Sequence, residues 1–194
     1  MSKPQRLAVF GGSFDPVHNG HLQIARTARD ALRLDLVLFI PCRQSPHKED
    51  GTVASEEERL KMLELATSDL PWANVSEIEM LLPPPSYSWV TAEALNEIYP
   101  AARLFWLMGA DQWELIQSWA RPEYLADLVE FIVHDRRGRS PRPLPGFRVH
   151  FIHGHHPASA TAIRNTVPGP LPPGWLHENV EQFITSRGLY RSCS

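Results

Sequence analysis

The sequence predicts an α/β fold, a single doubly wound Rossmann-like domain over residues 1–194 with a mostly parallel sheet. Short apolar runs alternate with segments of helical spacing from one end of the chain to the other, which is typical of such sheets. Several of these runs are apolar at every position, as parallel strands covered by helices on both faces require. The length of 194 residues fits one domain of roughly 100–200 residues.

The first expected elements are a strand, a helix and a second strand. Residues 7–10 form a continuous apolar run that ends at two glycines, which indicates a buried strand. A helix is expected over residues 18–32, where apolar side chains recur at helical spacing. The run 34–40, stopped by Pro41, predicts the second strand.

The middle of the chain predicts a loop over residues 44–53 and then a helix over 56–70, opened by a capping box of Ser55 and Glu58. Weak alternation over residues 75–80 favours a strand, and three prolines at 83–85 make a rigid break. The remaining expected elements are helices over 89–98, 122–128, 161–165 and 178–187 and strands over 103–108, 131–133 and 147–152. Gly188 fits the C-cap of the last helix.

Charge and composition exclude several classes of partner. The formal net charge of -3 gives no general attraction to nucleic acid or to an anionic membrane. No apolar stretch approaches the roughly 18 residues of a membrane helix, and none resembles the apolar centre of a secretory signal. Cys42 and Cys193 have no metal-like or disulfide-like spacing. We therefore expect a soluble, cytoplasmic protein; a homo-oligomer remains open.

Residues 11–22, which read GGSFDPVHNGHL, follow the first strand and carry the first candidate site. The glycines allow the backbone to approach a ligand, and the N-terminus of the next helix suits a phosphate. His18 and His21 lie three residues apart, so both rings can face one ligand, with room left by Gly20. A plain glycine turn and a metal-binding histidine pair are the alternatives.

This segment resembles the signature of the nucleotidyltransferase superfamily, and specifically of bacterial nicotinate-nucleotide adenylyltransferases. The resemblance implies that His18 and His21 contact the phosphates of ATP, and that the backbone at Gly12 and Ser13 helps to hold both nucleotides. It implies transfer of the adenylyl group of ATP to nicotinate mononucleotide, with nicotinate adenine dinucleotide and pyrophosphate as products. Mg²⁺ would join with ATP, with no metal ligands expected from the protein.

Two loops supply further expected contacts to the mononucleotide. The family has a proline–histidine–lysine element where this chain has Pro46, His47 and Lys48, so the resemblance implies that Lys48 meets a phosphate and His47 assists. Taken alone, these residues would be a solvated loop. The family's serine–tyrosine–threonine element implies that Tyr87 and Ser88 read the pyridine carboxyl group.

Residues 86–91 differ from the family pattern in two places. Ser88 stands where threonine is usual and keeps the hydroxyl, whereas Val90 stands where aspartate is usual. An alternative or additional role for Ser86 or Ser88 is the N-cap of the following helix.

A glycine–alanine–aspartate element follows the strand at 103–108, with a tryptophan eight residues beyond the aspartate. The resemblance implies that Asp111 contacts a nucleotide ribose or orients substrate, and that Trp119 stacks on the pyridine ring. The alternative for Trp119 is a core residue. Trp106, Trp113 and Trp175 are expected in the core or on the surface.

Residues 159–164 combine hydroxyl groups, an expected helix N-terminus and an arginine, which together suit an anion. The alternative is a capped helix with a solvated arginine. The family signature implies ATP phosphate contacts for Ser159, Thr161 and Arg164 and also retains Ile163 as part of the ATP site. Ala160 replaces a serine of that signature, as Ala158 replaces an isoleucine.

The implied reaction requires charge neutralisation and alignment rather than a base. The phosphate of the mononucleotide is ionised at neutral pH and attacks the α-phosphorus of ATP. We expect the positive potential to come from four catalytic side chains: His18, His21, Lys48 and Arg164.

Three other functions remain as alternatives. They are a related adenylyl- or cytidylyltransferase, a non-catalytic nucleotide-binding module, and a histidine-metal hydrolase. Separately, His153, His155 and His156 cluster near the end of a strand and leave a metal site open as an alternative. The basic segment 136–146 is expected to be a solvated loop.

Overall fold

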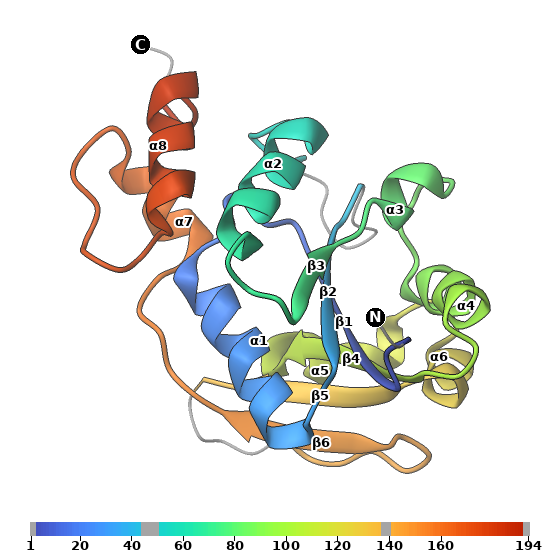
Figure 1. Ribbon diagram of the computed structural model, residues 1–194. Helices are drawn as coiled ribbons and strands as arrows, with labels where there is room; N and C mark the ends of the chain where they lie inside the picture. Colours follow the sequence, from blue (N-terminus) through green and yellow to red (C-terminus); the bar gives the residue numbers. More distant parts are fainter. Residues whose placement is uncertain (1–2, 44–50, 137–140, 192–194) are drawn as a thin grey trace.

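The computed structural model describes residues 3–43, 51–136 and 141–191, and its centre is a parallel sheet of six strands (Figure 1). The strand order is β3-β2-β1-β4-β5-β6, and every neighbouring pair is parallel. The strands are β1 Arg6–Gly12, β2 Leu36–Pro41, β3 Ala73–Val75, β4 Arg103–Gly109, β5 Glu130–Asp135 and β6 Val149–His153. The predicted doubly wound α/β fold is confirmed.

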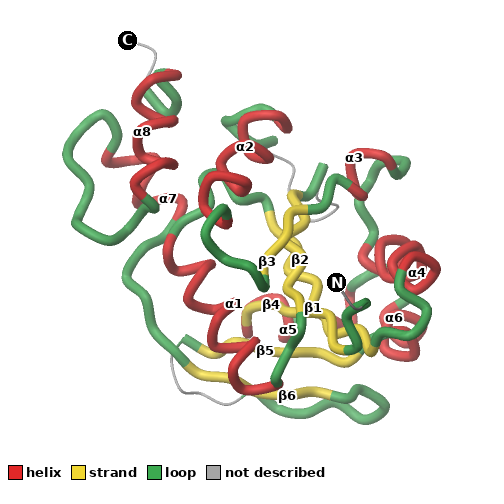
Figure 2. Tube along the Cα trace, in the orientation of Figure 1, coloured by secondary structure: helices red, strands yellow, loops and turns green. Residues whose placement is uncertain are grey.

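Helices cover both faces of this sheet (Figures 1 and 2). The helices that pack on one face are α1 Asn19–Leu32, α2 Glu56–Thr67, α7 Ala160–Thr166 and α8 Glu178–Arg187. The other face is covered by α3 Ile78–Leu81, α4 Ser88–Ile98, α5 Ala110–Glu114, the 3₁₀ turn η1 Ile116–Ser118 and α6 Pro122–Leu128. The chain crosses from one layer to the other between α2 and α4.

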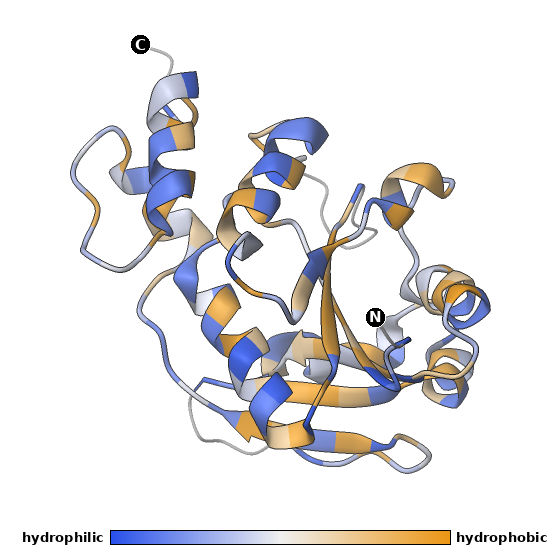
Figure 3. Cartoon of the chain, in the orientation of Figure 1, coloured by the Kyte–Doolittle hydropathy of each residue, from blue (hydrophilic) through white to orange (hydrophobic). Residues whose placement is uncertain are grey.

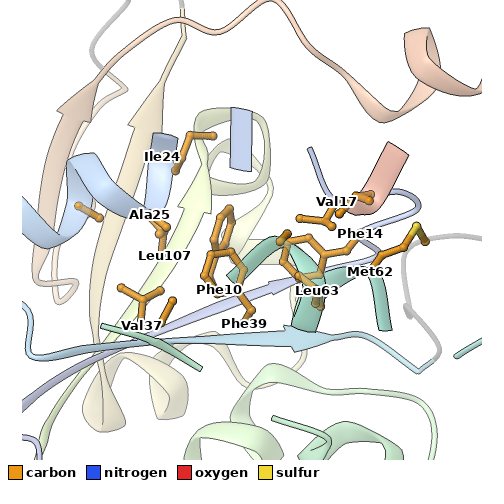
Figure 4. Close-up of a cluster of buried hydrophobic side chains, with 14 of the residues drawn as sticks. Phe10, Phe14, Val17, Ile24, Ala25, Val37, Phe39, Met62, Leu63 and Leu107 are labelled. Carbon is orange, nitrogen blue, oxygen red and sulfur yellow. The ribbon is translucent and has the colours of Figure 1, made fainter. Parts of the chain in front are cut away.

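Alternation along the strands divides the core into two clusters. Phe10, Phe39 and Leu107 point to the face of α1 and α2, where they meet Ile24 and Leu63 (Figure 4). Their neighbours in sequence point to the opposite face and pack against α4, α5 and α6. Both faces of each central strand are therefore buried, which explains the unbroken apolar runs. Figure 3 shows apolar strands between helices that carry polar residues on their outer sides.

The central strands create a point at which the direction of winding reverses. From β1 the chain moves outward through β2 and β3, and then returns to β4 on the other side of β1. In open α/β sheets, the crevice beyond the carboxyl ends of the strands at such a reversal is where ligands bind. In this protein that crevice lies beyond the carboxyl ends of β1 and β4.

Most predicted elements are confirmed, including the capping box of Ser55 and Glu58 and the left-handed C-cap Gly188, with φ of 65°. The predicted strand over residues 75–80 is wrong: β3 ends at Val75, and residues 78–81 are helical. Glu79 faces a buried polar network there, so the alternating pattern did not come from a strand with one apolar face. The short elements α5 and η1 were not predicted.

No helix among the described residues is long and apolar enough to cross a membrane.

Candidate active site

A pocket of about 630 Å³ opens beyond the carboxyl ends of the central strands. Its walls come from the residues after β1, β4 and β5 and from the loop that leads into α4. Of the predicted site residues, those that line it are Gly12, Ser13, His21, Tyr87, Ser88, Asp111 and Trp119. The fold therefore brings predicted site residues from separate parts of the sequence to one concave site.

His18 and His21 open α1, with His18 at the N-cap position. Their rings are stacked with centroids 3.7 Å apart, and the backbone N–H of His18 donates to Nδ1 of His21 at 3.2 Å. A side chain on Gly20 would start 2.9 Å from the ring of His18. The packing of the two rings therefore requires glycine between them.

The two imidazoles are neutral at neutral pH, contrary to their expected role as cations. Burial, together with the smaller effects of the charges of Arg136 and His156, lowers the pKa of His18 to about 3. Burial also lowers the pKa of His21 well below its ordinary value, assisted by His18 and Arg136. Because Nδ1 of His21 accepts a hydrogen bond, the neutral ring carries its proton on Nε2. His21 is thus a neutral N–H donor on the pocket wall.

The last predicted phosphate element lies against the first. Arg164 of α7 donates from Nη1 to the backbone carbonyl of Asp15 at 2.6 Å, and its Nη2 lies 3.5 Å from Oγ1 of Thr161. The carbonyl of Ala158, just before α7, would lie 3.4 Å from a Cβ on Gly20. The hydrogen bond from Arg164 to Asp15 thus joins the two segments predicted to bind ATP across 149 residues of sequence.

Within α7, Ser159 is the N-cap residue and accepts a hydrogen bond from the N–H of Ala162 at 3.2 Å. The side chain of Ile163 is fully buried in the core cluster of α1 and α2. The side chain of Ile163 therefore anchors the helix, and its N–H and carbonyl are hydrogen-bonded to Ser159 and Val167. The predicted part of Ile163 in the ATP site stays a prediction.

The loop before α4 presents backbone donors to the pocket. The N-cap of α4 is Tyr87, not Ser86 or Ser88, and its side chain makes no capping hydrogen bond. The described part of the chain offers no acceptor for the N–H groups of Ser88 and Trp89. Ser88 lines the pocket, so this helix start can receive an anionic group.

The tryptophans separate into distinct roles. Trp119 is half-buried at the end of η1 and lines the pocket, as its predicted stacking role requires. Trp113 belongs to the core and donates from Nε1 to the carbonyl of Arg142 at 3.0 Å. Trp106 is buried in β4 but also forms part of the pocket floor. Trp175 packs partly buried against the core cluster of α1 and α2.

His47 and Lys48 lie outside the described residues, so their predicted contacts remain predictions. Among the described residues, Arg136 is the pocket-lining side chain with a permanent positive charge. Arg136 is exposed, as the predicted solvated loop requires, and it also lines the pocket, which the sequence did not indicate. Residues 137–140 lie outside the described residues.

Several pocket residues escaped the sequence analysis. His134 and Asp135 end β5 and are almost fully buried, and both line the pocket. Both residues directly follow the apolar run 131–133, and this position at the end of a strand could have marked them as site residues. Glu79 and Cys42 also line it, but nothing in their local sequence marks them, because distant elements bring them together.

Arg59 of α2 supports the pocket from behind. Its guanidinium is fully buried and donates from Nη1 to the carbonyls of Ser13 at 2.9 Å and Cys42 at 2.8 Å. The first loop and the end of β2 are thereby held at a fixed separation. Among the described residues there is no group of three or more His, Cys, Asp or Glu side chains that could hold a metal ion.

Comparisons with known proteins agree with this site. The cytidylyltransferase-like family model matches residues 9–166. The probable nicotinate-nucleotide adenylyltransferase of Methylacidiphilum infernorum (isolate V4) is 38% identical over 193 residues, covering 95% of this chain and 92% of the relative. The nicotinate-nucleotide adenylyltransferase of Bacillus subtilis (strain 168) is 32% identical over 197 residues, with coverage of 97% and 100%.

A solved structure shows the same fold. The Plasmodium falciparum nicotinic acid mononucleotide adenylyltransferase complexed with NaAD superposes with a TM-score of 0.77 at 16% sequence identity. The superposition covers 96% of this chain and 97% of the other.

Proposed function

The chain belongs to the cytidylyltransferase-like family and, within it, to the nicotinate-nucleotide adenylyltransferases, and from this premise we propose its reaction. The protein transfers the adenylyl group of ATP to nicotinate mononucleotide, forming nicotinate adenine dinucleotide and pyrophosphate. One observation carries the proposal: the first and last phosphate elements meet, through Arg164 and Asp15, beside a pocket that also holds Trp119 and the start of α4.

The pocket can orient the two substrates by different kinds of contact. At one end, His21 offers Nε2–H and Arg136 offers a guanidinium, which suit phosphate oxygens. At the loop before α4, Ser88 offers an N–H that has no acceptor among the described residues and lies at a positive helix end, which favours the carboxylate of nicotinate over the neutral amide of nicotinamide. Trp119 supplies an aromatic face for the electron-poor ring.

The chemistry follows from that arrangement. The phosphate of the mononucleotide is already a nucleophile, so no side chain has to remove a proton. The protein holds two anions in line and stabilises the charge that grows on the departing pyrophosphate. We assign this stabilisation to N–H donors at His18 and His21, to Arg136 and Arg164, and to the predicted contact of Lys48.

We also propose Mg²⁺ as the cofactor, bound mainly to ATP phosphates and water, as is usual for this ion. The carboxylates of Asp111 and Asp135 on the pocket wall are oxygen donors of the type that Mg²⁺ prefers. Excess EDTA is expected to abolish turnover and added Mg²⁺ to restore it. Full activity in EDTA would contradict a metal requirement.

One assay tests the reaction itself. ATP and nicotinate mononucleotide are incubated with the protein and Mg²⁺, and both the dinucleotide and pyrophosphate are followed. We expect equal amounts of the two products and little product when CTP replaces ATP. Binding of ATP without any dinucleotide would instead support a nucleotide-binding module.

The location follows from composition. Two cysteines without disulfide-like spacing fit a reducing compartment, so we propose the cytoplasm as the site of action.

A further inference from the structure

Glu79 is a buried acid on the pocket wall with no part in the transfer chemistry described above. It lies in α3, between β3 and the proline-rich loop, and its side chain is only 5% exposed. Burying a carboxylate is costly unless hydrogen bonds compensate it. The partners of Glu79 therefore indicate why this acid is placed there.

Three donors from three different elements meet on this carboxylate. The hydroxyl of Thr91, in the first turns of α4, donates to Oε1 at 2.9 Å. The hydroxyl of Ser86, in the loop before α4, and the thiol of Cys42, directly after β2, also hydrogen-bond to Glu79. Ser86 and Cys42 line the pocket themselves.

The chemistry of an ionised carboxylate matches this set of partners. It only accepts hydrogen bonds and offers about four acceptor positions, whereas a glutamine amide has one oxygen and adds two donors. Burial and, to a smaller extent, the charge of Glu79 raise the pKa of the Cys42 thiol to about 11, so the thiol remains a protonated donor. The pKa of Glu79 lies above its ordinary value, because burial raises it more than the hydrogen bonds from Thr91, Ser86 and Cys42 lower it.

We propose that Glu79 is a positioning residue for pyridine recognition. By holding Thr91, Ser86 and Cys42 together, it fixes the start of α4 where the N–H of Ser88 can receive the carboxylate of the mononucleotide. The inference rests on the proposed function, because it assigns Glu79 to the mononucleotide half of that same site. Glu79 itself need not touch the substrate.

Two other roles for Glu79 predict different results. A purely structural residue would change stability and leave the relative use of the two pyridine mononucleotides unaltered. A residue acting by its charge would disfavour the anionic nicotinate, so its neutralisation would increase the preference for nicotinate. If Glu79 is a positioning residue, its replacement should lower the preference for nicotinate. Displacing the start of α4 weakens a contact that the carboxylate of nicotinate uses fully and the amide of nicotinamide does not.

The experiment compares Glu79→Gln and Glu79→Ala with the wild type. We expect the KM for nicotinate mononucleotide to rise at least about tenfold, because the hydrogen bonds that the carboxylate of Glu79 accepts from its three partners are lost or weakened. The KM for ATP should stay within about twofold, and the ratio of kcat/KM for nicotinate over nicotinamide mononucleotide should fall at least about fivefold. Glu77→Gln is the matched control: Glu77 is exposed and does not line the pocket, so the ratio should not change.

Three outcomes would overturn the proposal: an unchanged ratio, a ratio shifted toward nicotinate, or an equal loss of affinity for ATP and mononucleotide. Thermal unfolding checks that each variant is folded. If both Glu79 variants fail to fold, Thr91→Val removes one donor and keeps the acid, and must lower the same ratio. If the wild type makes no dinucleotide, the proposed function fails; if it turns over but the variants keep the ratio, only the role of Glu79 fails.

Discussion

At the scale of single residues, the state of the two imidazoles decides how the site can treat phosphate. His18 and His21 are buried in stacked contact, and burial keeps both neutral in the free protein. The contribution that we propose for them is therefore directional hydrogen bonding from N–H groups rather than fixed positive charge. Arg136 supplies permanent charge at the described part of the pocket wall.

His21→Ala is expected to lower kcat by about 10²–10³, since one donor to the transition state is removed. His21→Gln, which can place an amide N–H near the former Nε2, should keep more activity than the alanine variant because the role requires no charge. Steady-state kinetics with both substrates saturating provides the measurement. A change in kcat below about threefold for His21→Ala would remove this residue from the mechanism.

Trp119 offers a test of the mononucleotide end. Trp119→Ala is expected to raise the KM for nicotinate mononucleotide more than it lowers kcat, because stacking acts on the bound ground state as well. Trp119→Phe keeps an aromatic face and should recover most of the affinity. An unaltered KM in the alanine variant would show that the ring does not rest on this side chain.

At the scale of elements, Asp15 joins segments that are far apart in sequence. Its carboxylate accepts from the N–H groups of Val53 and Ala54 and from the hydroxyl of Tyr190 at 2.8 Å. Its backbone carbonyl accepts from Arg164. The loop after β1 is thus held by the segment before α2, by α7 and by Tyr190, which lies beyond the end of α8.

Tyr190→Phe removes one hydrogen bond from a buried carboxylate and should destabilise the protein by about 1–3 kcal/mol. Denaturant unfolding measures the effect. Tyr99→Phe is the control, because Tyr99 packs partly buried against the other core cluster and its hydroxyl makes no hydrogen bond to the described residues. A change within about 0.5 kcal/mol is expected for this variant. Equal destabilisation by both variants would mean that the bond to Asp15 contributes nothing specific.

At the scale of the whole molecule, the two ends of the sheet serve different purposes. The carboxyl ends carry the pocket, whereas Glu130 begins β5 at the amino ends. Glu130 is buried and is paired with Arg103, Arg148 and His150. Burial alone would raise the pKa of Glu130, but the hydrogen bonds and charges of those partners outweigh it and lower the pKa.

The lowered pKa of Glu130 predicts how the stability of the protein changes with pH. The ion cluster contributes stability above the ordinary glutamate pKa of about 4.3 and loses it as the pH falls toward the lower folded value. Glu130→Gln should therefore be less stable than the wild type at pH 7, and the difference should shrink as the pH is lowered to about 3. Urea unfolding at both pH values tests this expectation.

The same variant separates stability from catalysis. Because Glu130 lies at the opposite end of β5 from His134 and Asp135, the KM values of Glu130→Gln should match those of the wild type. A stability difference that does not depend on pH, or a changed KM, would contradict this division between the two ends of the sheet.

The sequence predicts those structural features that depend on a few neighbouring residues, and it misses those that depend on contacts between distant segments. The strands, the capping box at Ser55 and the helix stop at Gly188 follow from patterns of a few residues, and the structure confirms them. The segment 75–80 was misassigned because the burial of Glu79 depends on Thr91 and Ser86, which no local pattern shows. The role of Arg136 was missed because a basic, proline-rich stretch looks the same whether or not its first residue faces a pocket.

By itself, the sequence determined the alternation of buried strands and helices and the motif residues that we propose to meet nucleotides, since periodicity and short motifs are local properties of the chain. Only the tertiary structure decided which side chains are charged and which share a wall. Burial makes His18 and His21 neutral, and packing gathers donors from three elements on Glu79. Proton affinity and hydrogen-bond partners depend on surroundings that the fold assembles from distant segments, and so they cannot be deduced from neighbouring residues.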